Sequence, residues 1–391
     1  MIRIELGKGH DRRALAGHPW IFSNEIAAAK GELTPGAPAE LFSAGGDFIG
    51  TGYYNPHSLI AARILSRERT DIDSTEFYLD RIGRALAHRQ SLYPGLATFR
   101  VIHGEGDFLP GLVVDKYGEY LSIQFLSYGM DARREPVIEA LCKIFQPAGI
   151  VARNDVAVRQ LEGLPEQVEI LAGDIPELVE TVEHGLRFWV NLLAGQKTGH
   201  FLDQKDNHLL LKDHAAGKEV LDCFCYSGSW GIHAAAFGAA SVTCLDISER
   251  AIALARKNAA KNSVSDRMSF DVSDAFERLR NMKGEGRRFD LIVMDPPAFV
   301  KSRKSLKEAQ KGYLTINRRA LELLRPDGIL VTCSCSYHME REMFRDLLSQ
   351  AARQAGRTLR LLASRSQAPD HPVLLNVPET EYLKCLVVQA V

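Results

Sequence analysis

The sequence predicts an α/β protein whose C-terminal half is a doubly wound, mostly parallel sheet, preceded by two smaller modules. From about residue 188 onward, short and almost continuous apolar runs alternate with helical patterns, as expected for strands that are covered on both faces. Residues 1–72 instead show short strands separated by Gly- and Pro-containing turns, and residues 73–188 mix helices and strands. Because 391 residues are too many for one hydrophobic core, we predict three domains, at 1–72, 73–188 and 189–391.

The composition is that of an ordinary globular protein, with 46% hydrophobic and 25% charged residues. No apolar run approaches the roughly 20 residues that span a bilayer, and the first residues lack the apolar segment of a signal peptide. We therefore expect a cytoplasmic protein. The formal net charge of -1 leaves a nucleic-acid partner open, because a basic patch can be hidden in a neutral total.

The cysteines indicate reduced thiols. Their number is odd, they lack the spacing of a disulfide framework, and five of them fall within apolar runs. No C-x-x-C motif occurs, and the two C-x-C pairs have no second Cys or His pair at zinc-finger spacing. We expect neither disulfides nor a metal site. The seven are Cys142, Cys223, Cys225, Cys244, Cys333, Cys335 and Cys385.

The first two modules are predicted in outline. Residues 1–70 carry eight Lys and Arg against seven acids, so charge alone does not mark this β-rich module as an RNA binder. The polar linker at 70–74 contains Asp and Ser residues that could cap a helix at 77–92. The second module then continues with strands near 99–105, 112–118, 121–127 and 149–155 and a helix at 134–145.

The third module has five predicted strands and a nucleotide-binding type of turn. The strands lie at 218–224, 241–247, 268–274, 289–295 and 328–334. After the first strand, Gly228 and Gly231 would let backbone N–H groups approach a nucleotide closely, because glycine has no Cβ. The G-x-G-x-x-G fingerprint of dinucleotide sites is absent, which disfavours NAD.

Acidic residues end three successive strands. Asp222, Asp246 and Asp274 would share one rim of the sheet, where Asp246 could accept the ribose hydroxyls of an adenosine and Asp274 could meet the adenine amino group. Each could instead be a helix N-cap, but together they favour a nucleoside pocket. Carboxylates also favour the positive sulfonium of S-adenosylmethionine, which lacks phosphates, so we expect that cofactor.

A rigid acidic loop follows the fourth strand. Asp295 is followed by Pro296 and Pro297, which hold the chain in a stiff extended turn. The loop lies at the carboxyl edge of the sheet, where open α/β sheets bind their ligands. A purely structural turn is the alternative.

The fifth strand carries two thiols. Cys333 lies within the apolar run and is predicted to be a small buried hydrophobe, whereas Cys335 lies at the strand exit between two serines. Neighbouring strands would bring Asp295 and Cys335 to one cleft. Thiolate attack at carbon 6 of a pyrimidine makes carbon 5 nucleophilic enough to accept a methyl group, and Asp295 could hydrogen-bond N3 or the exocyclic amine of cytosine. Methylation at a nitrogen needs no thiol.

In order along the chain, the motifs resemble the RlmI-like family of bacterial 23S ribosomal RNA 5-methylcytosine methyltransferases. The resemblance implies an N-terminal PUA domain, a small α+β central domain and a class I, Rossmann-like, seven-stranded methyltransferase domain. The motifs that carry it are GHPWIFSNEI (17–26), HGEGDFLPGLVVDKYG (103–118), RNDVAVRQLEG (153–163), KTGHFLDQKDNH (197–208), DPPAF (295–299), SCS (334–336) and HPVLLNVPETEYLK (371–384).

The resemblance also implies roles for single residues. Cys335 would be the nucleophile, with Asp295 beside it as a second catalytic residue. Cys333 departs from the family pattern, in which we expect an apolar residue. The implied S-adenosylmethionine-binding residues are Gln204, Asp222, Phe224, Tyr226, Gly228, Asp246, Ile247, Asp274, Ala275 and Asp295. The residues expected to contact the substrate RNA are Pro296, Pro297, Phe299, Lys301, Arg303 and Lys304.

Ribosomal RNA is the expected partner, either as 23S RNA or within a partly assembled large subunit, and the resemblance favours a homodimer. Residues 301–325 contain eight Lys and Arg against two acids, which suits phosphate contacts but also suits one solvated helix face. The target cytosine would have to leave its stack to reach an enclosed pocket.

Other functions remain open at this point. A methyltransferase of the same architecture could act on a ring nitrogen, for example of guanine, without depending on Cys335. A non-catalytic RNA-binding assembly factor could retain the fold. A nicotinamide-dependent oxidoreductase fits least, because the glycine triplet is missing.

Overall fold

The computed structural model describes residues 1–299 and 306–391. The chain forms two compact units, each assembled from segments that are distant in sequence. Unit 1 consists of Met1–Val182, Val190–Leu202 and Pro369–Thr380, and unit 2 consists of Glu183–Trp189, Asp203–Ala368 and Glu381–Val391. Within the described residues, no helix has both the length and the apolar character needed to cross a membrane. The boundaries of the three predicted domains stay a prediction.

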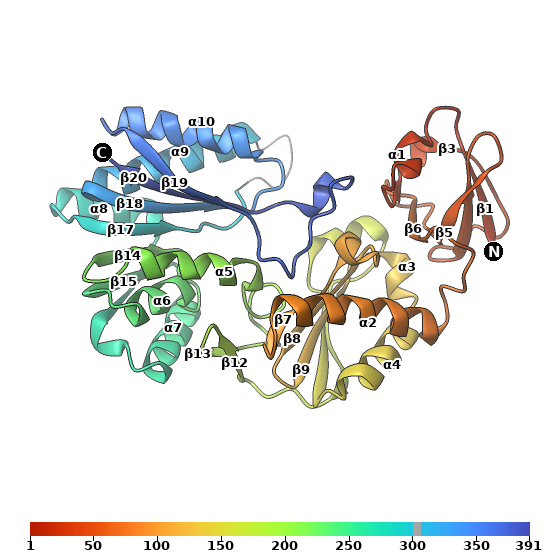
Figure 1. Ribbon diagram of the computed structural model, residues 1–391, viewed down its shortest axis with the longest axis horizontal. Coiled ribbons are helices and arrows are strands. Elements are labelled where there is room, and N and C mark those ends of the chain that lie inside the picture. The colour runs from red at the N-terminus through yellow and green to blue at the C-terminus, as the bar shows by residue number, and fades with distance from the viewer. Residues whose placement is uncertain (300–305) are drawn as a thin grey trace. The chain divides into compact units, whose positions relative to one another are not determined.

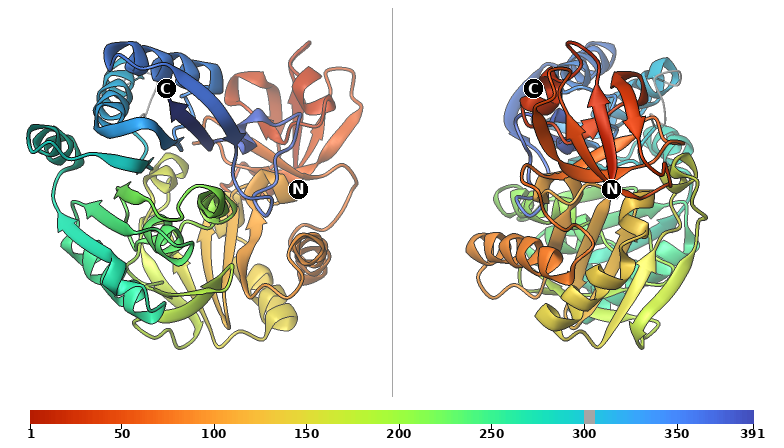
Figure 2. Two further views of the ribbon diagram at one scale, coloured as in Figure 1. Left: turned by 60° about the vertical axis from the view of Figure 1, so that its left-hand side comes forward. Right: turned by 90° about the vertical axis from the view of Figure 1, so that its right-hand side faces the viewer.

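Unit 1 begins with a six-stranded sheet of the order β2-β6-β5-β4-β1-β3, whose red and orange strands face the viewer in the right-hand view of Figure 2. All its strand pairs are antiparallel except β1 with β4. A Cβ on Gly52 in β5 would lie 1.9 Å from the carbonyl oxygen of Arg63 in β6, so the close pairing of these two strands requires glycine at this position. The elements are β1 (Ile2–Leu6), α1 (Arg12–Leu15), β2 (Trp20–Ile21), β3 (Ile26–Lys30), β4 (Pro38–Phe42), β5 (Phe48–Tyr54) and β6 (Ala62–Ser66).

Unit 1 continues with a five-stranded sheet of the order β11-β10-β9-β8-β7. The predicted helix at 77–92 is observed as α2 (Thr75–Leu92), and the Ser74 hydroxyl caps it by accepting a hydrogen bond from the Phe77 N–H. The helix predicted at 134–145 is also confirmed, as α4 (Arg134–Phe145). The remaining elements are β7 (Thr98–His103), β8 (Leu112–Tyr117), β9 (Tyr120–Phe125), α3 (Tyr128–Asp131), β10 (Gly149–Arg153) and β11 (Val168–Gly173).

A buried carboxylate joins the two sheets of unit 1. Glu162 accepts hydrogen bonds from Arg63 (Nη2, 2.8 Å), Ser58 (Oγ, 2.6 Å) and Asn55 (Nδ2, 3.0 Å). Arg63 and Glu162 are both more than 90% buried. Such a charge is stable in a protein interior only because its hydrogen-bonding capacity is met.

Unit 2 is built on a seven-stranded sheet of the order β16-β15-β14-β17-β18-β20-β19. Strands β14 to β18 are parallel, and β20 runs antiparallel to both of its neighbours. Helices α5, α6 and α7 form one group of neighbours and α8, α9 and α10 another, on opposite faces of the sheet (Figure 1). The predicted doubly wound sheet is therefore confirmed, and all five predicted strands are present.

The order of the strands reverses between β14 and β17, and ligands of open α/β sheets bind at such a switch point. The strands are β14 (Glu219–Cys223), β15 (Ser241–Asp246), β16 (Met268–Val272), β17 (Phe289–Met294), β18 (Leu324–Ser334), β19 (Leu359–Arg365) and β20 (Lys384–Ala390). The helices are α5 (Lys205–His208), α6 (Ser229–Ala236), α7 (Glu249–Lys261), α8 (Ala275–Gly284), α9 (Leu306–Leu323) and α10 (Arg341–Gln354). A two-stranded sheet of β12 (Val179–Glu183) and β13 (Leu186–Val190) precedes them.

Candidate active site

The turn between β14 and α6 has an unusual backbone. Phe224, Tyr226 and Gly228 have φ values of 63°, 47° and 86°, and non-glycine residues in this left-handed region concentrate at functional sites. Gly228 precedes α6 directly, and a Cβ at this position would lie 3.1 Å from the Cβ of Ala255. The turn therefore places its backbone at the carboxyl end of β14, and a ligand bound there could approach the backbone closely.

Asp222 lies beneath this turn and is fully buried. Its Oδ2 accepts a hydrogen bond of 2.9 Å from the Gly231 N–H. Burial raises the pKa of Asp222 well above its usual range, the Gly231 N–H acts against this shift, and the negative charges of Asp295 and Asp246 add to it. The ionisation of Asp222 is thus coupled to that of the acids at the ends of β15 and β17.

The two other predicted acids have different surroundings. Asp246, half-buried at the end of β15, accepts 2.9 Å hydrogen bonds from the N–H groups of Tyr226 and Ser248. Asp274 is exposed and follows the end of β16 by two residues, where it caps α8 by accepting from the Glu277 N–H. The capping role considered for Asp274 is therefore observed. Ile247 is exposed and Ala275 is buried.

Asp295 follows β17 directly and is held by two N–H donors. Its Oδ2 accepts hydrogen bonds from Gln204 Nε2 (3.0 Å) and from the indole Nε1 of Trp230 (3.1 Å). Gln204 is itself buried and oriented by Asn207, whose Nδ2 donates to Gln204 Oε1 at 2.7 Å. Nothing in the sequence singles out Trp230, because an indole two residues after a glycine has many ordinary roles. Of the prolines that follow Asp295, Pro296 is buried and Pro297 is exposed.

Cys335 lies just beyond β18, between two buried serines that are both bound to Tyr313 of α9. Ser334 Oγ donates to the Tyr313 hydroxyl at 3.0 Å, and the Tyr313 hydroxyl is 3.1 Å from Ser336 Oγ. Both serines are almost fully buried, whereas Cys335 is half-buried. Burial raises the pKa of Tyr313 to about 12, the serine hydrogen bonds act against this shift, and the charges of Cys335 and Asp295 add to it. Tyr313 therefore holds the two serines that flank Cys335.

A buried cation lies beside the same thiol. Lys384 stands opposite Ser334 in the β18–β20 ladder, and its Nζ donates 2.7 Å hydrogen bonds to the carbonyl oxygens of Ser336 and Tyr382. Burial lowers the pKa of Lys384 to about 8, and the charge of Cys335 acts against this shift. The sequence offered no signal for Lys384, because it enters the site through the antiparallel strand β20.

The other thiols near the sheet are inert by comparison. Cys333 is fully buried opposite Cys385, and burial raises its pKa well above the usual range. Burial also raises the pKa of Cys223, with the charge of Asp222 adding to it, and a hydrogen bond with Cys244 together with burial raises the pKa of Cys225. Cys333 therefore acts as a small buried hydrophobe, as predicted from its place in the apolar run.

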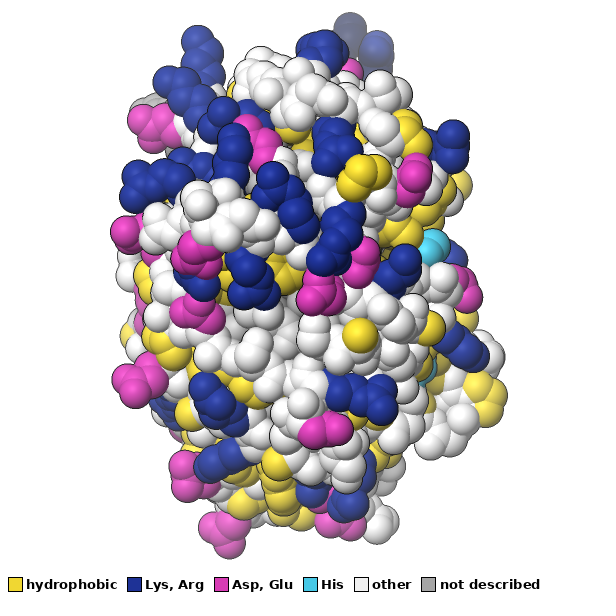
Figure 3. Space-filling view, turned by 90° about the vertical axis from the view of Figure 1, so that its left-hand side faces the viewer, with side chains coloured by type: hydrophobic (Ala, Val, Ile, Leu, Met, Phe, Trp, Pro, Cys, Tyr) yellow, Lys and Arg dark blue, Asp and Glu magenta, His cyan; other side chains and the backbone are white. Residues whose placement is uncertain are grey.

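The predicted basic segment is only partly described. Lys301, Arg303 and Lys304 lie outside the described residues. Two arginines of the segment contact unit 2 itself: Arg319 donates to the Phe276 carbonyl, and Arg325 forms ion pairs with Glu219 and Asp290. The exposed members on α9 are Lys307 and Lys311. Figure 3 shows Lys and Arg side chains gathered in the upper half of one face of the molecule, with acidic side chains among them.

Comparisons with known proteins agree with this fold. Residues 4–67 match the family of PUA-like domains, and residues 136–388 match the family of S-adenosylmethionine-dependent methyltransferases. The chain is 41% identical over 388 residues to the ribosomal RNA large subunit methyltransferase I of Pseudoalteromonas atlantica, which covers 98% of each chain. It is 37% identical over 393 residues to the protein of the same name from Tolumonas auensis, which covers 99% of each chain.

Two solved structures share the fold over 100% of both chains at 21% identity. One, from Streptococcus mutans, is provisionally described as an S-adenosylmethionine-dependent methyltransferase and superposes with a TM-score of 0.85. The other, SMU.776, also provisionally described as a methyltransferase, was solved with SAH and superposes with a TM-score of 0.87.

Proposed function

The chain belongs to the family of S-adenosylmethionine-dependent methyltransferases, and from this premise we propose that it forms 5-methylcytosine in large-subunit ribosomal RNA. The observation that carries the proposal is Cys335. This half-buried thiol lies between two buried serines, next to a buried ammonium group and near a carboxylate. Its surroundings suit a nucleophile and have no role in methylation at a nitrogen.

The residues at the end of the sheet fit S-adenosylmethionine. The left-handed turn gives close access to the backbone, and the acids at the ends of β14, β15 and β17 favour a positive sulfonium. When bound, S-adenosylmethionine supplies an electrophilic methyl group. Asp246 would accept the ribose hydroxyls, Asp274 would meet the adenine amino group, and Phe224 and Tyr226 would line the turn. The other residues assigned to this pocket are Gln204, Asp222, Gly228, Ile247, Ala275 and Asp295.

Cys335 would attack carbon 6 of the cytosine, forming a C–S bond and making carbon 5 nucleophilic. After carbon 5 has gained the methyl group, its proton leaves to a base or water, and the C–S bond breaks to restore the thiolate. The Lys384 ammonium favours the thiolate form, because an adjacent positive charge lowers the cost of the negative sulfur. Asp295, held by Gln204 and Trp230, would bind N3 or the exocyclic amine of the base.

The PUA-like module would bind RNA, and the loop after β17 would contact the target base and its neighbours. Pro296, Pro297 and Phe299 would contact the base or its neighbours, and Lys301, Arg303 and Lys304 would contact phosphates. Relatives named for the large ribosomal subunit support rRNA as the substrate class, presented as 23S RNA or within a partly assembled subunit. A homodimer stays a prediction from the family resemblance.

The test compares Cys335→Ala with Cys333→Ala, two thiol removals that lie two residues apart. Large-subunit rRNA without the modification is incubated with each protein and S-adenosylmethionine, and the methylated nucleosides are identified by mass spectrometry. We expect Cys335→Ala to lose at least about 10³-fold in rate and Cys333→Ala to form 5-methylcytosine. Full activity of Cys335→Ala, or a product methylated on a ring nitrogen, would refute the proposal.

A further inference from the structure

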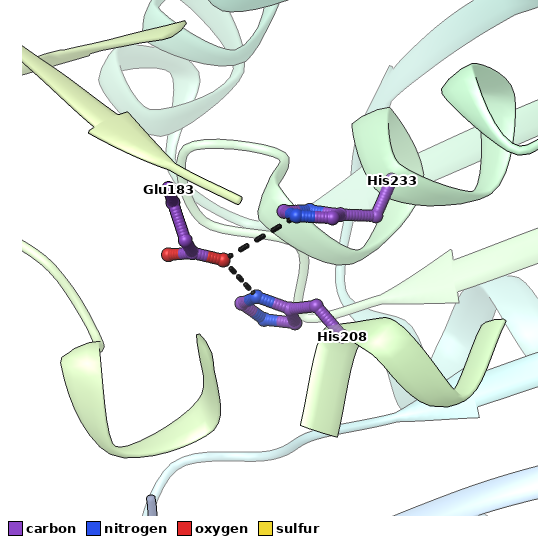
Figure 4. Close-up of side chains that lie close together, drawn as sticks. All are labelled: Glu183, His208 and His233. Carbon is purple, nitrogen blue, oxygen red and sulfur yellow. Dashed lines mark hydrogen bonds and ion pairs between the residues drawn. The ribbon is translucent and has the colours of Figure 1, made fainter. Parts of the chain in front are cut away.

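Three buried side chains of unit 2 that the proposed methyl transfer does not use meet at one point. Glu183 ends β12, His208 ends α5 and His233 lies within α6, and none is more than 2% exposed. Figure 4 shows both imidazole rings turned toward the same carboxylate oxygen. His208 Nδ1 is 2.5 Å and His233 Nε2 is 3.5 Å from Glu183 Oε1.

The hydrogen bonding of His233 fixes which of its nitrogens carries the proton. Its Nδ1 is 2.8 Å from the carbonyl oxygen of Ser229, and because a carbonyl can only accept, Nδ1 must be the N–H donor. A neutral His233 then presents the lone pair of Nε2 to Glu183. This nitrogen is buried and has no hydrogen-bond partner among residues 1–299 and 306–391.

A lone pair and a carboxylate oxygen that face each other in a dry interior repel unless a positive charge lies between them. Either a proton or a metal cation could supply that charge. Nδ1 of His233 is committed to the Ser229 carbonyl, so Nε2 is the nitrogen that faces Glu183 and is available to a cation. An imidazole that donates Nδ1–H to a carbonyl and presents Nε2 is also the usual arrangement of a histidine metal ligand.

We propose that Glu183, His208 and His233 bind a divalent transition-metal ion, with Zn²⁺ as the best match. Two imidazole nitrogens and one carboxylate oxygen are a common zinc ligand set, with a fourth position for water. Bond lengths of about 2.0–2.2 Å place tetrahedral ligand atoms about 3.4 Å apart, close to the 3.5 Å between His233 Nε2 and Glu183 Oε1. The three ligand atoms lie within 4.8 Å of one another, and the close His208–Glu183 contact of 2.5 Å must lengthen when the metal binds.

The metal would have a structural role that reaches the catalytic carboxylate. The His208 ring packs edge-on against Trp230 with ring centroids 4.6 Å apart, and Trp230 donates to Asp295. Fixing α5 to α6 through the metal would therefore hold both donors of Asp295, since Gln204 immediately precedes α5. Consecutive ligands are separated by 25 residues along the chain. This spacing is too long to form a recognisable metal-binding motif.

The test is the metal content of the full-length chain, purified without a polyhistidine tag or a chelator and dialysed against a small excess of Zn²⁺ and then against metal-free buffer. We expect about one Zn²⁺ per chain by elemental analysis, and after exchange a visible Co²⁺ absorption of tetrahedral intensity. His233→Ala should lower the metal content at least about tenfold. His214→Asn, a histidine six residues after His208, is the matched control and should keep it.

Glu183→Gln keeps the size of the carboxylate side chain while removing its charge, so it tests the site even if His233→Ala fails to fold. It should lose the metal as well. Chelation should lower the midpoint of thermal unfolding of the wild type by about 5 °C or more and leave that of Glu183→Gln unchanged. A wild-type chain that binds less than about a tenth of an equivalent, or a folded Glu183→Gln or His233→Ala that keeps its Zn²⁺, would overturn the proposal.

Discussion

Lys384 is the residue that links the ionisation of the site to pH. Its ammonium group is buried, hydrogen-bonded to two carbonyl oxygens and close to Cys335. In the proposed mechanism, methyl transfer requires Cys335 as thiolate and Lys384 as ammonium, two conditions that hold together only within a limited pH range.

We expect a bell-shaped pH profile of the methylation rate, with its falling limb at about pH 8, where Lys384 loses its proton. Lys384→Met should lack this limb and should be about 10–100-fold slower at pH 7. Single-turnover rates at saturating RNA measure this, with the exposed Lys218→Met as control. An unchanged profile of Lys384→Met would remove Lys384 from the mechanism.

The lowered pKa of Lys384 also makes the free energy of unfolding depend on pH. Because the folded pKa of Lys384 is about 8 and its ordinary value is 10.5, the unfolded chain binds more protons between these pH values. Its contribution to the free energy of unfolding therefore rises with pH in that window. The rise should be smaller in Lys384→Met.

Single residues differ in how far the sequence could reveal them. Asp295 and Cys335 were predictable because each follows a recognisable strand directly. Trp230 and Lys384 were not, because an indole and an ammonium group have many ordinary roles and only the folded chain shows that they face Asp295 and Cys335. Glu183 and His233 could not be identified as site residues from the sequence for the same reason.

At the scale of elements, α9 positions the nucleophile through a single hydroxyl. Tyr313→Phe removes the partner of Ser334 and Ser336. Losing the hydrogen bonds between the Tyr313 hydroxyl and these two buried serines should lower the free energy of unfolding by about 1–3 kcal/mol and reduce the methylation rate, because Cys335 is held less firmly. Urea unfolding and single-turnover rates measure the two effects. Tyr120→Phe, at a half-buried tyrosine of unit 1, should change neither, and equal effects of both variants would contradict this role.

The packing of α6 against β15 depends on a missing Cβ. A methyl group on Gly231 would lie 2.5 Å from Cys244 Sγ and 3.1 Å from Asp222 Oδ2. We expect Gly231→Ala to cost about 1–3 kcal/mol of stability and to weaken S-adenosylmethionine binding, as measured by calorimetry. Gly284→Ala, where a methyl group meets nothing within 4 Å, should be neutral or slightly stabilising. Normal cofactor binding by Gly231→Ala would show that the turn tolerates displacement of α6.

The elements of unit 2 were the most predictable part of the fold. Strands buried on both faces are continuous apolar runs, and β14, β15, β17 and β18 show this plainly. The antiparallel pairing of β20 between β18 and β19 could not be predicted from the sequence, because the alternation of strands and helices ends before β20. Most of the segment between β19 and β20, Pro369–Thr380, belongs to unit 1.

At the scale of the whole molecule, the units are not continuous in sequence. Segments 190–202 and 369–380 join unit 1 although they flank or interrupt the methyltransferase sheet. For example, Arg89 in α2 donates to the Asp370 carbonyl oxygen at 2.7 Å. Composition changes along a chain reveal modules but not such long-range assembly, so linear domain boundaries could only approximate it.

The Glu162 junction should dominate the acid stability of unit 1. Burial alone would raise the pKa of Glu162, but Arg63, Ser58 and Asn55 hold it below the ordinary 4.5. Its contribution is therefore present above pH 4.5 and is lost as the pH falls through the lower folded value.

Glu162→Ala should cost about 3–5 kcal/mol, because it leaves Arg63 buried without its anion. The exposed Glu166→Ala should stay within about 0.5 kcal/mol of the wild type. Denaturant unfolding between pH 7 and pH 4 measures both costs. Equal stability of the two variants, or a wild type that loses none of its advantage over Glu162→Ala on acidification, would contradict this account.

The central claim is that Cys335 becomes covalently attached to the base during methylation, and trapping that attachment tests it most directly. RNA carrying 5-fluorocytidine should accept the methyl group but cannot release a carbon 5 proton, so the C–S bond should persist. We predict a protein–RNA adduct that survives denaturation, requires S-adenosylmethionine and maps to Cys335 by peptide mass spectrometry. Methylation of ordinary RNA with no such adduct, or an adduct on another residue, would contradict the account.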